Sequence, residues 1–201
     1  MSYKNTTLEI LKNDFGIVVK YAVLQLPTSK FVPSAQLEKE INEAYSIPHL
    51  SEKARSELFV SPLFRELYRH SKGNFHLYSG YHLNADHKRK LNGECDFLLT
   101  VGEYDILQVQ PTVFTAVEAK RNEIEEGIPQ VAAQMLGAYL FNIQKKKPIH
   151  TIYGATTNAF DWIFLKLENG STLTIDSKRY YLNNLPELLG ILQGIVLEYQ
   201  P

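Results

Sequence analysis

The sequence contains a single cysteine, Cys95, among its 201 residues. One cysteine excludes an internal disulfide and any zinc site built from several thiolates, and this usage is typical of the reducing cytoplasm. His82 and His87 lie near Cys95 in the sequence, but the spacing of the three residues fits no usual zinc pattern. The sequence therefore offers no case for a transition-metal centre here.

Long apolar runs and an excess of either charge are also missing. No stretch reaches the about 18 uninterrupted apolar residues of a membrane span, and the N-terminal stretch lacks the apolar core of a signal peptide. The formal net charge is −1, so the molecule as a whole has no electrostatic attraction to nucleic acid, and any such contact must come from a local basic patch. We expect a cytoplasmic protein without a membrane segment.

The apolar content, 44% of the residues, is enough for one sizeable core. Residues 1–48 differ in character from the rest, because prolines interrupt them and only short strand-like or helix-like stretches fit between. One of these, "SAQLEKEINEAYS", has helical spacing with Ser34 as its N-cap. We predict a small N-terminal arm over residues 1–48 that packs on a main domain over residues 49–201.

The main domain has a readable order of elements. Helical spacing follows Leu50, and Pro62 should kink or restart that helix. The later periodicities and turn signals predict strands over 74–84, 94–101 and 112–120, with a loop over 86–93; a helix from Pro129 to Lys147; a strand over 148–158; a hairpin at Asn169-Gly170; and a final helix over 185–199. The strand after the helix from Pro129 should run parallel to the strand before it. The predicted fold is α/β (α+β), with a mixed central sheet flanked by helices and a C-terminal hairpin and helix.

Charged side chains occur on two neighbouring predicted strands. Asp96 stands in "ECDFLL", and Glu118 and Lys120 end the strand "TVFTAVEAK". Side chains alternate along a strand, so Glu118 and Lys120 share one face. Taken alone, a charged strand end is most often a solvated terminus. Because the strand of Asp96 neighbours that of Glu118, however, both carboxylates can project at one place on the sheet.

Two adjacent carboxylates repel each other unless a cation lies between them. Mg²⁺, or Mn²⁺ in its place, binds one or two carboxylates, a carbonyl oxygen and several waters, and the backbone carbonyl of Ala119 is a candidate for the carbonyl ligand. Such an ion lowers the pKa of water, and Lys120 would assist the attack of that water. These are the requirements of hydrolytic phosphodiester cleavage.

Taken in order, these pieces resemble the PD-(D/E)XK nuclease superfamily, which has the restriction-endonuclease-like core. "CDFLL" is similar to the strand that carries the aspartate, with Cys95 where a proline is usual, and "AVEAK" is similar to the (D/E)-x-K strand. Gln130 matches a glutamine on the next helix, and "SEKARSELFVSP" looks like the first core helix, as in the nuclease domain of type I restriction motor subunits. The resemblance covers residues 50–157, and "YGATTNAFDWIFLKL" is similar to small bacterial, particularly cyanobacterial, members.

The resemblance implies Mg²⁺-dependent cleavage of DNA. Asp96 and Glu118 would bind the metal, Lys120 would be catalytic, and Gln130 would orient water or phosphate. The partner implied is DNA, and cutting both strands usually takes two active sites, which suggests a homodimer or a larger complex. The alternative is a non-catalytic module with the same core that binds nucleic acid or another protein.

Two smaller questions stay open at this level. On the first core helix the resemblance assigns the acid to Glu52, whereas the helix surface favours Glu57, beside Leu58. Basic runs offer weak candidates for phosphate contact. The first is "HKRK" in the predicted loop, comprising His87, Lys88, Arg89 and Lys90. The second is "KKK" over 145–147, which also suits a helix C-terminus.

Overall fold

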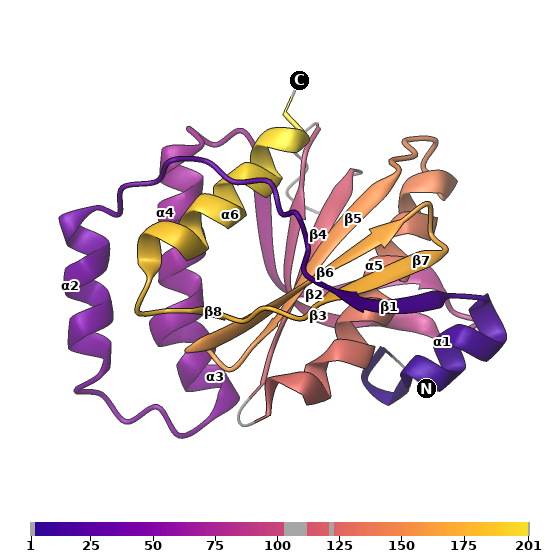
Figure 1. Cartoon of the computed structure of the whole chain (residues 1–201), viewed down its shortest axis with the longest axis horizontal. Helices are drawn as coiled ribbons and strands as arrows, with labels where there is room; N and C mark the ends of the chain where they lie inside the picture. Colours follow the sequence, from indigo (N-terminus) through magenta and orange to yellow (C-terminus); the bar gives the residue numbers. More distant parts are fainter. Residues whose placement is uncertain (1–2, 103–111, 121–122, 201) are drawn as a thin grey trace.

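The computed structural model describes residues 3–102, 112–120 and 123–200. Its centre is an eight-stranded sheet in the order β1-β7-β6-β5-β4-β3-β2, with β8 paired to β6 (Figure 1). The strands are β1 (Val18–Ala22), β2 (His76–Asp86), β3 (Leu91–Thr100), β4 (Val113–Ala119), β5 (Thr151–Thr157), β6 (Asp161–Glu168), β7 (Thr172–Asp176) and β8 (Tyr180–Tyr181). The helical elements are η1 (Tyr3–Asn5), α1 (Leu8–Phe15), α2 (Ala35–Ala44), α3 (Glu52–Arg55), η2 (Ser56–Val60), α4 (Ser61–His70), η3 (Ile124–Gly127), α5 (Ile128–Gln144) and α6 (Leu185–Glu198). The predicted mixed α/β class is confirmed.

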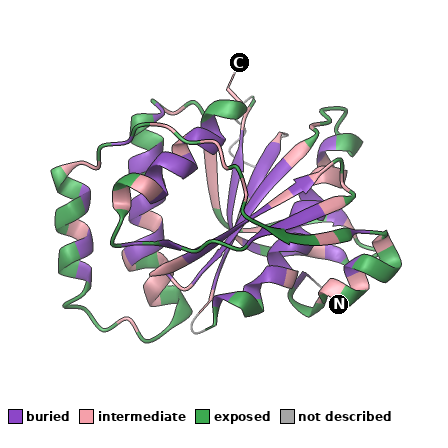
Figure 2. Ribbon diagram, viewed as in Figure 1, coloured by how far each residue is buried: buried purple, intermediate pink, exposed green. Residues whose placement is uncertain are grey.

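Helices cover both faces of the sheet. α2, α4 and α6 pack on one face, around an aromatic core that includes Phe64, Phe97 and Trp162. α1 and α5 pack on the other face, around an aliphatic core. Figure 2 shows the buried residues along the strands and on the inward sides of the helices. Trp162 is fully buried.

The first 48 residues extend the sheet as well as pack on it. β1 pairs in parallel with β7 at one edge, with Val18 opposite Thr172. The segment that follows crosses α6, where the backbone N–H of Ser29 donates to the carbonyl of Gly190 at 2.9 Å. A side chain at Gly190 would place its Cβ 2.6 Å from the carbonyl oxygen of Ser29, so glycine is required at this crossing. α2 then begins after Ser34, whose hydroxyl accepts the N–H of Leu37, which confirms the predicted cap.

The helix predicted after Leu50 runs from Glu52 to His70, and the irregularity expected near Pro62 is a π-helical turn that comes just before it. α3 passes into a π-helical turn, η2, in which the N–H of Ser61 donates to the carbonyl of Ser56, five residues back. α4 follows, with Pro62 in its first turn, where a proline nitrogen needs no acceptor. The π-helical turn contains one more residue than an α-helical turn, and turns of this kind are frequent at functional sites.

Several predicted boundaries were wrong; for example, the helix predicted to reach Lys147 ends at Gln144. The loop between β2 and β3 is a short turn over 87–90, because buried Leu83, Ala85 and Leu91 extend both strands toward it. α5 begins at Ile128 rather than Pro129, since Ile128 is itself buried under the helix. The parallel pairing of β4 with β5 and the hairpin at Asn169-Gly170 are confirmed.

Asn142 fixes the start of β4 from α5. Its Oδ1 accepts the N–H of Val113 at 2.9 Å and its Nδ2 donates to the Val113 carbonyl at 2.7 Å, and the side chain is fully buried. Asn142→Leu would leave both backbone groups buried without partners. We expect it to lower the free energy of unfolding by about 2–3 kcal/mol in urea denaturation. Gln144→Met, which loses one hydrogen bond to Ala85 near the surface, should cost less than half as much; equal losses would contradict this role.

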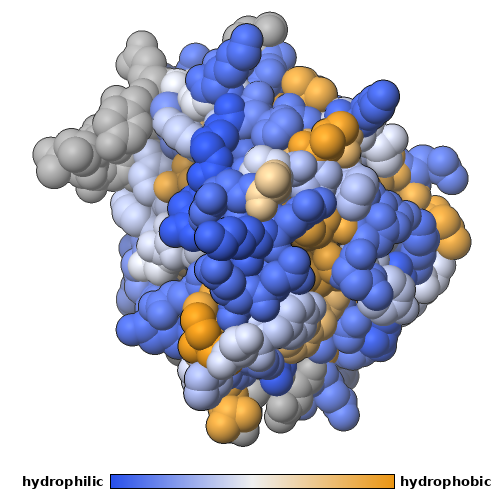
Figure 3. Space-filling model, turned by 90° about the vertical axis from the view of Figure 1, so that its left-hand side faces the viewer, coloured by the Kyte–Doolittle hydropathy of each residue, from blue (hydrophilic) through white to orange (hydrophobic). Residues whose placement is uncertain are grey.

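No helix in the described part of the chain combines the length and apolar character needed to cross a membrane. The face that carries α2 and α4 is mainly hydrophilic, with apolar side chains only in small groups (Figure 3). The exposed apolar side chains near this face include Tyr45, Ile47 and Leu50, in the segment between α2 and α3.

Candidate functional site

β3 and β4 bring the two predicted carboxylates together. The strands are antiparallel, with Phe97 opposite Val117, and continuing this register by one residue places Asp96 opposite Glu118. Asp96 Oδ2 accepts the backbone N–H of Ala119 at 2.7 Å, so its carboxylate is held against the end of β4. The meander inferred from the sequence thus places the two acids on neighbouring strands.

The predicted lysine and glutamine join the same cluster. Lys120 Nζ lies 2.8 Å from Glu118 Oε1 and 3.0 Å from Gln130 Oε1. Only 4% of Glu118 and 8% of Gln130 is exposed to solvent. An ammonium group has three N–H donors, so one donor of Lys120 remains after these two contacts.

A second glutamine, Gln134, belongs to the cluster and was not predicted. Its Nε2 donates to Glu118 Oε2 at 2.8 Å and lies 3.4 Å from the carbonyl oxygen of Glu94. A sequence signal for it exists, because Gln130 and Gln134 are four residues apart and therefore share one face in the apolar first half of the helix. That pattern alone does not say which strand the face covers.

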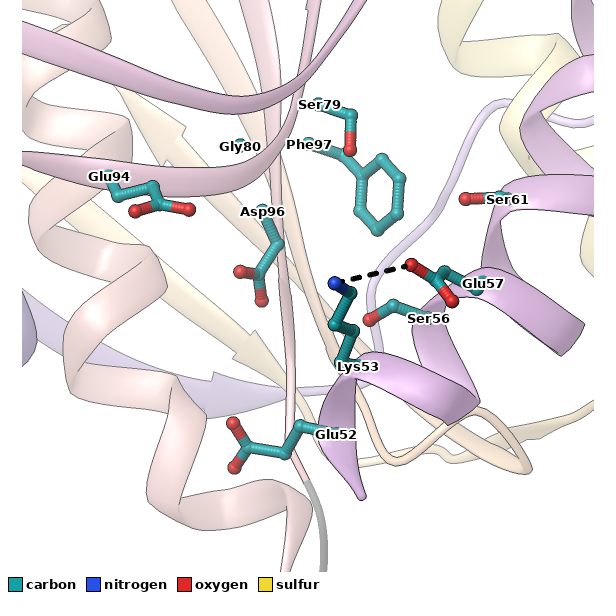
Figure 4. Close-up of a pocket in the computed structure, with 10 residues that line it drawn as sticks. All are labelled: Glu52, Lys53, Ser56, Glu57, Ser61, Ser79, Gly80, Glu94, Asp96 and Phe97. Atoms are coloured by element: carbon teal, nitrogen blue, oxygen red, sulfur yellow. Dashed lines mark ion pairs between the residues drawn. The ribbon is translucent and has the colours of Figure 1, made fainter. Parts of the chain in front are cut away.

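Asp96 is the member of the cluster that lines a hollow of ≈ 440 Å³ between the sheet and the helices α3 and η2. Asp96 and Glu94 line it from β3, and Glu52 and Glu57 line it from the helices (Figure 4). Glu57 points toward Lys53, with 3.9 Å between Glu57 Oε1 and Lys53 Nζ. The negative charge of Glu52 adds to the raised pKa of Asp96. Both helix acids line the hollow, and the choice between them stays open.

Burial and neighbouring carboxylates raise the pKa of both strand carboxyls. For Asp96, burial is the main cause of the raised pKa; Glu52 and Glu94 add to it, while the N–H of Ala119 and the charge of Lys120 oppose it. For Glu118, burial and then the Asp96 carboxylate raise the pKa to about 7, against Lys120 and Gln134. The protein thus places two carboxyls where ionising both is costly unless further positive charge is present.

The backbone around Lys120 is also fixed. Its N–H donates to the carbonyl of Thr157 at 2.7 Å, which continues the parallel pairing of β4 with β5. Gly127, at the end of η3, packs against Thr156 and Lys120: an added Cβ would overlap the Thr156 hydroxyl and lie 3.2 Å from Lys120 Cγ. A side chain larger than glycine's hydrogen at residue 127 would therefore push on the lysine.

The basic run "HKRK" lies away from this cluster. It forms the turn between β2 and β3, where Arg89 pairs with Asp86 at 2.7 Å and its guanidinium lies over the ring of Phe15. Lys90 precedes Asp96 by six strand residues, which corresponds to about 20 Å. The run "KKK" follows the C-terminus of α5, at the opposite end of that helix from Gln130.

The oxygen atoms of the cluster are of the type that a hard divalent cation binds. Among the described residues no three His, Cys, Asp or Glu side chains are grouped closely enough to hold a metal by themselves. A Mg²⁺ site in proteins usually has only one or two carboxylates, completed by water and other oxygens. Asp96 and Glu118, with the Ala119 carbonyl, are oxygen donors of that kind, and burial is the main cause of their raised pKa values.

Comparison of the chain with models of protein families, with curated protein sequences and with solved structures found no match to any of them.

Proposed function

We propose that the protein is a Mg²⁺-dependent nuclease that hydrolyses phosphodiester bonds of DNA at the cluster formed by Asp96, Glu118 and Lys120. The observation that carries the proposal is the convergence of two carboxylates from adjacent strands with a lysine whose Nζ lies 2.8 Å from one of them. A solvated strand end would need no such convergence, and it would not be buried.

Asp96 and Glu118 would hold the metal, together with the carbonyl of Ala119. When bound, the ion supplies positive charge that makes water more acidic and stabilises the charge that develops on the phosphate. Glu118 and Gln130 hold the Lys120 ammonium in place by accepting two of its three N–H donors. Among the described residues the third donor has no hydrogen-bond partner, and in this proposal it would orient a water molecule or a phosphate oxygen. Glu52 adds negative charge from the helix side and attracts the cation.

The proposal extends to a restriction-endonuclease-like arrangement of the core. Supporting features are the antiparallel β3–β4 pair that carries the acids, the helix α5 after the Glu-x-Lys strand, and the parallel return of β5 beside β4. The first core helix is represented by α3 to α4, which lines the hollow opposite Asp96. DNA is the proposed partner, and cleavage of both strands would require a homodimer or a larger complex.

The direct test is calorimetric titration of the protein with Mn²⁺ and Mg²⁺, followed by incubation with supercoiled and single-stranded DNA. We expect one saturable Mn²⁺ site, loss of that site in Asp96→Ala, and cleavage that stops when EDTA is added. Asp86→Ala is a matched control, because Asp86 is also a strand aspartate, yet it pairs with Arg89 outside the cluster.

The same experiment distinguishes a nuclease from a non-catalytic module that only binds nucleic acid. A module that only binds nucleic acid would bind DNA without taking up Mn²⁺, and Asp96→Ala would leave its affinity for DNA unchanged or higher. That result would refute the nuclease proposal.

A further inference from the structure

Regular pairing between β3 and β4 ends where the carboxylates begin. The antiparallel register runs through Leu99↔Thr115 to Phe97↔Val117 and goes no further. Beyond this pair, side chains link the two strands. One link is the hydrogen bond from the Ala119 N–H to Asp96 Oδ2.

Gln134 provides the second link, from α5. Its amide nitrogen donates to the Glu118 carboxylate on β4 and lies 3.4 Å from the Glu94 carbonyl on β3, two residues before Asp96. Both neighbours are acceptors only, so the amide must present its nitrogen to them. The two links lie at the same level of the sheet and bridge the same two strands.

The remaining atom of this amide indicates why a glutamine is present. Gln134 is fully buried, and its Oε1 has no hydrogen-bond partner within the described residues. An unpartnered buried acceptor is costly, and an apolar side chain would avoid that cost. The fold therefore retains this amide for its two donors.

We infer that Gln134 is a positioning residue that fixes the gap between β3 and β4 and so the separation of the Asp96 and Glu118 carboxylates. The link to metal binding rests on the proposed function, whereas the bridging of the strands does not. Gln134 contacts neither water nor substrate in this role; it acts through Glu118 and the Glu94 backbone.

The test compares Gln134→Met with Gln144→Met. Methionine keeps the length of the side chain and removes both donors, and Gln144 is a matched control because it lies on the same helix and donates to a backbone carbonyl, that of Ala85. In the metal-free protein, hydrogen exchange measured by NMR should be about tenfold faster at the Ala119 amide in Gln134→Met. The Lys120 amide, which bonds to β5, should keep its rate in both variants. An unchanged Ala119 rate would overturn the inference.

The second readout is the affinity for Mn²⁺. Loss of an outer-shell partner typically weakens metal binding 10- to 100-fold, and we expect the Mn²⁺ Kd of Gln134→Met to rise by about that factor while that of Gln144→Met stays within twofold. An unchanged Kd, in a wild-type protein that binds the ion, would also overturn the inference. If the wild type binds no Mn²⁺, the proposed function fails, and the Ala119 exchange rate alone decides the role of Gln134.

A second variant protects the test against misfolding of the first. Gln134→Asn keeps the amide but is one methylene shorter, so it cannot reach both Glu118 and Glu94. It should show the same faster exchange at Ala119. Exchange at the wild-type rate in a folded Gln134→Asn protein would count against the bridging role.

Discussion

Replacing Lys120 with methionine is expected to lower the rate of DNA cleavage by on the order of 10³-fold. Methionine keeps the aliphatic length of the side chain and removes the only ammonium that lies between Glu118 and Gln130 among the described residues. Nothing else in the cluster donates a charged N–H toward the carboxylates there. Circular dichroism should remain that of the wild type, because the backbone of residue 120 is held by its own hydrogen bond to Thr157.

Lys166→Met is the matched control for this experiment. Lys166 also pairs with a glutamate two residues away on a strand, with 2.9 Å between its Nζ and Glu168 Oε1, but it lies on β6 outside the cluster. Its replacement should leave cleavage within twofold of the wild type. Metal binding by Lys120→Met should persist or tighten, because a positive charge beside the site is lost. Cleavage at the wild-type rate by Lys120→Met would refute the role assigned to the lysine.

The order of elements could be read from the sequence because each depends on local signals. Alternation marks β2, a short apolar run marks β4, an Asn-Gly pair marks the hairpin after β6, and the connecting helix α5 allows β4 and β5 to run parallel. The pairing of β1 with β7 could not be read in this way. It joins Val18 to Thr172, far apart in the chain, and periodicity shows that a strand has an inner face without showing which strand lies beside it.

The candidate site divides in the same manner. Asp96, Glu118 and Lys120 were predicted because their strands are neighbours in sequence, so a local meander is enough to join them. Glu52 and Glu57 both line the hollow, on either side of the point where α3 passes into the π-helical turn, and the sequence periodicity of a regular α-helix does not predict that turn. The partners of Gln134 depend on how α5 rotates over the sheet, which the sequence of the helix does not set.

Glu118→Gln is expected to stabilise the metal-free protein at pH 8 while weakening its affinity for Mn²⁺ by at least about 100-fold. The first effect follows from the raised pKa, because ionising Glu118 in the fold works against burial and against Asp96. An amide carries no charge and avoids that cost, which is on the order of 1–3 kcal/mol. Gln134 can accommodate the new amide, since its unpartnered Oε1 can turn to accept an N–H. The second effect follows from the loss of one of the two carboxylates.

The raised pKa of Glu118 determines how the stability difference between Glu118→Gln and the wild type changes with pH. The folded pKa of Glu118, about 7, lies above the ordinary value of 4.5, so the folded state binds more protons than the unfolded state between these values. The stability contributed by the protonated carboxyl is complete below pH 4.5 and is lost as the pH rises through about 7. In urea denaturation with EDTA, the advantage of Glu118→Gln over the wild type should therefore grow from near zero at pH 4.5 to its full size at pH 8.

Glu168→Gln serves as the control for this series, because Glu168 pairs with Lys166 on a strand but its side chain is 43% exposed. Its effect on stability should show no comparable rise across the same pH window. Adding Mn²⁺ should reverse the order at pH 8, since an ion at about 1,000 times its Kd stabilises the wild type by about 4.1 kcal/mol and does little for Glu118→Gln. The contrary outcome is that Glu118→Gln is the less stable protein at pH 8 without metal. In that case the ion pair between Glu118 and Lys120 outweighs the cost of burying the carboxylate. The carboxylates would then belong to a structural ion-pair network and not to a metal site.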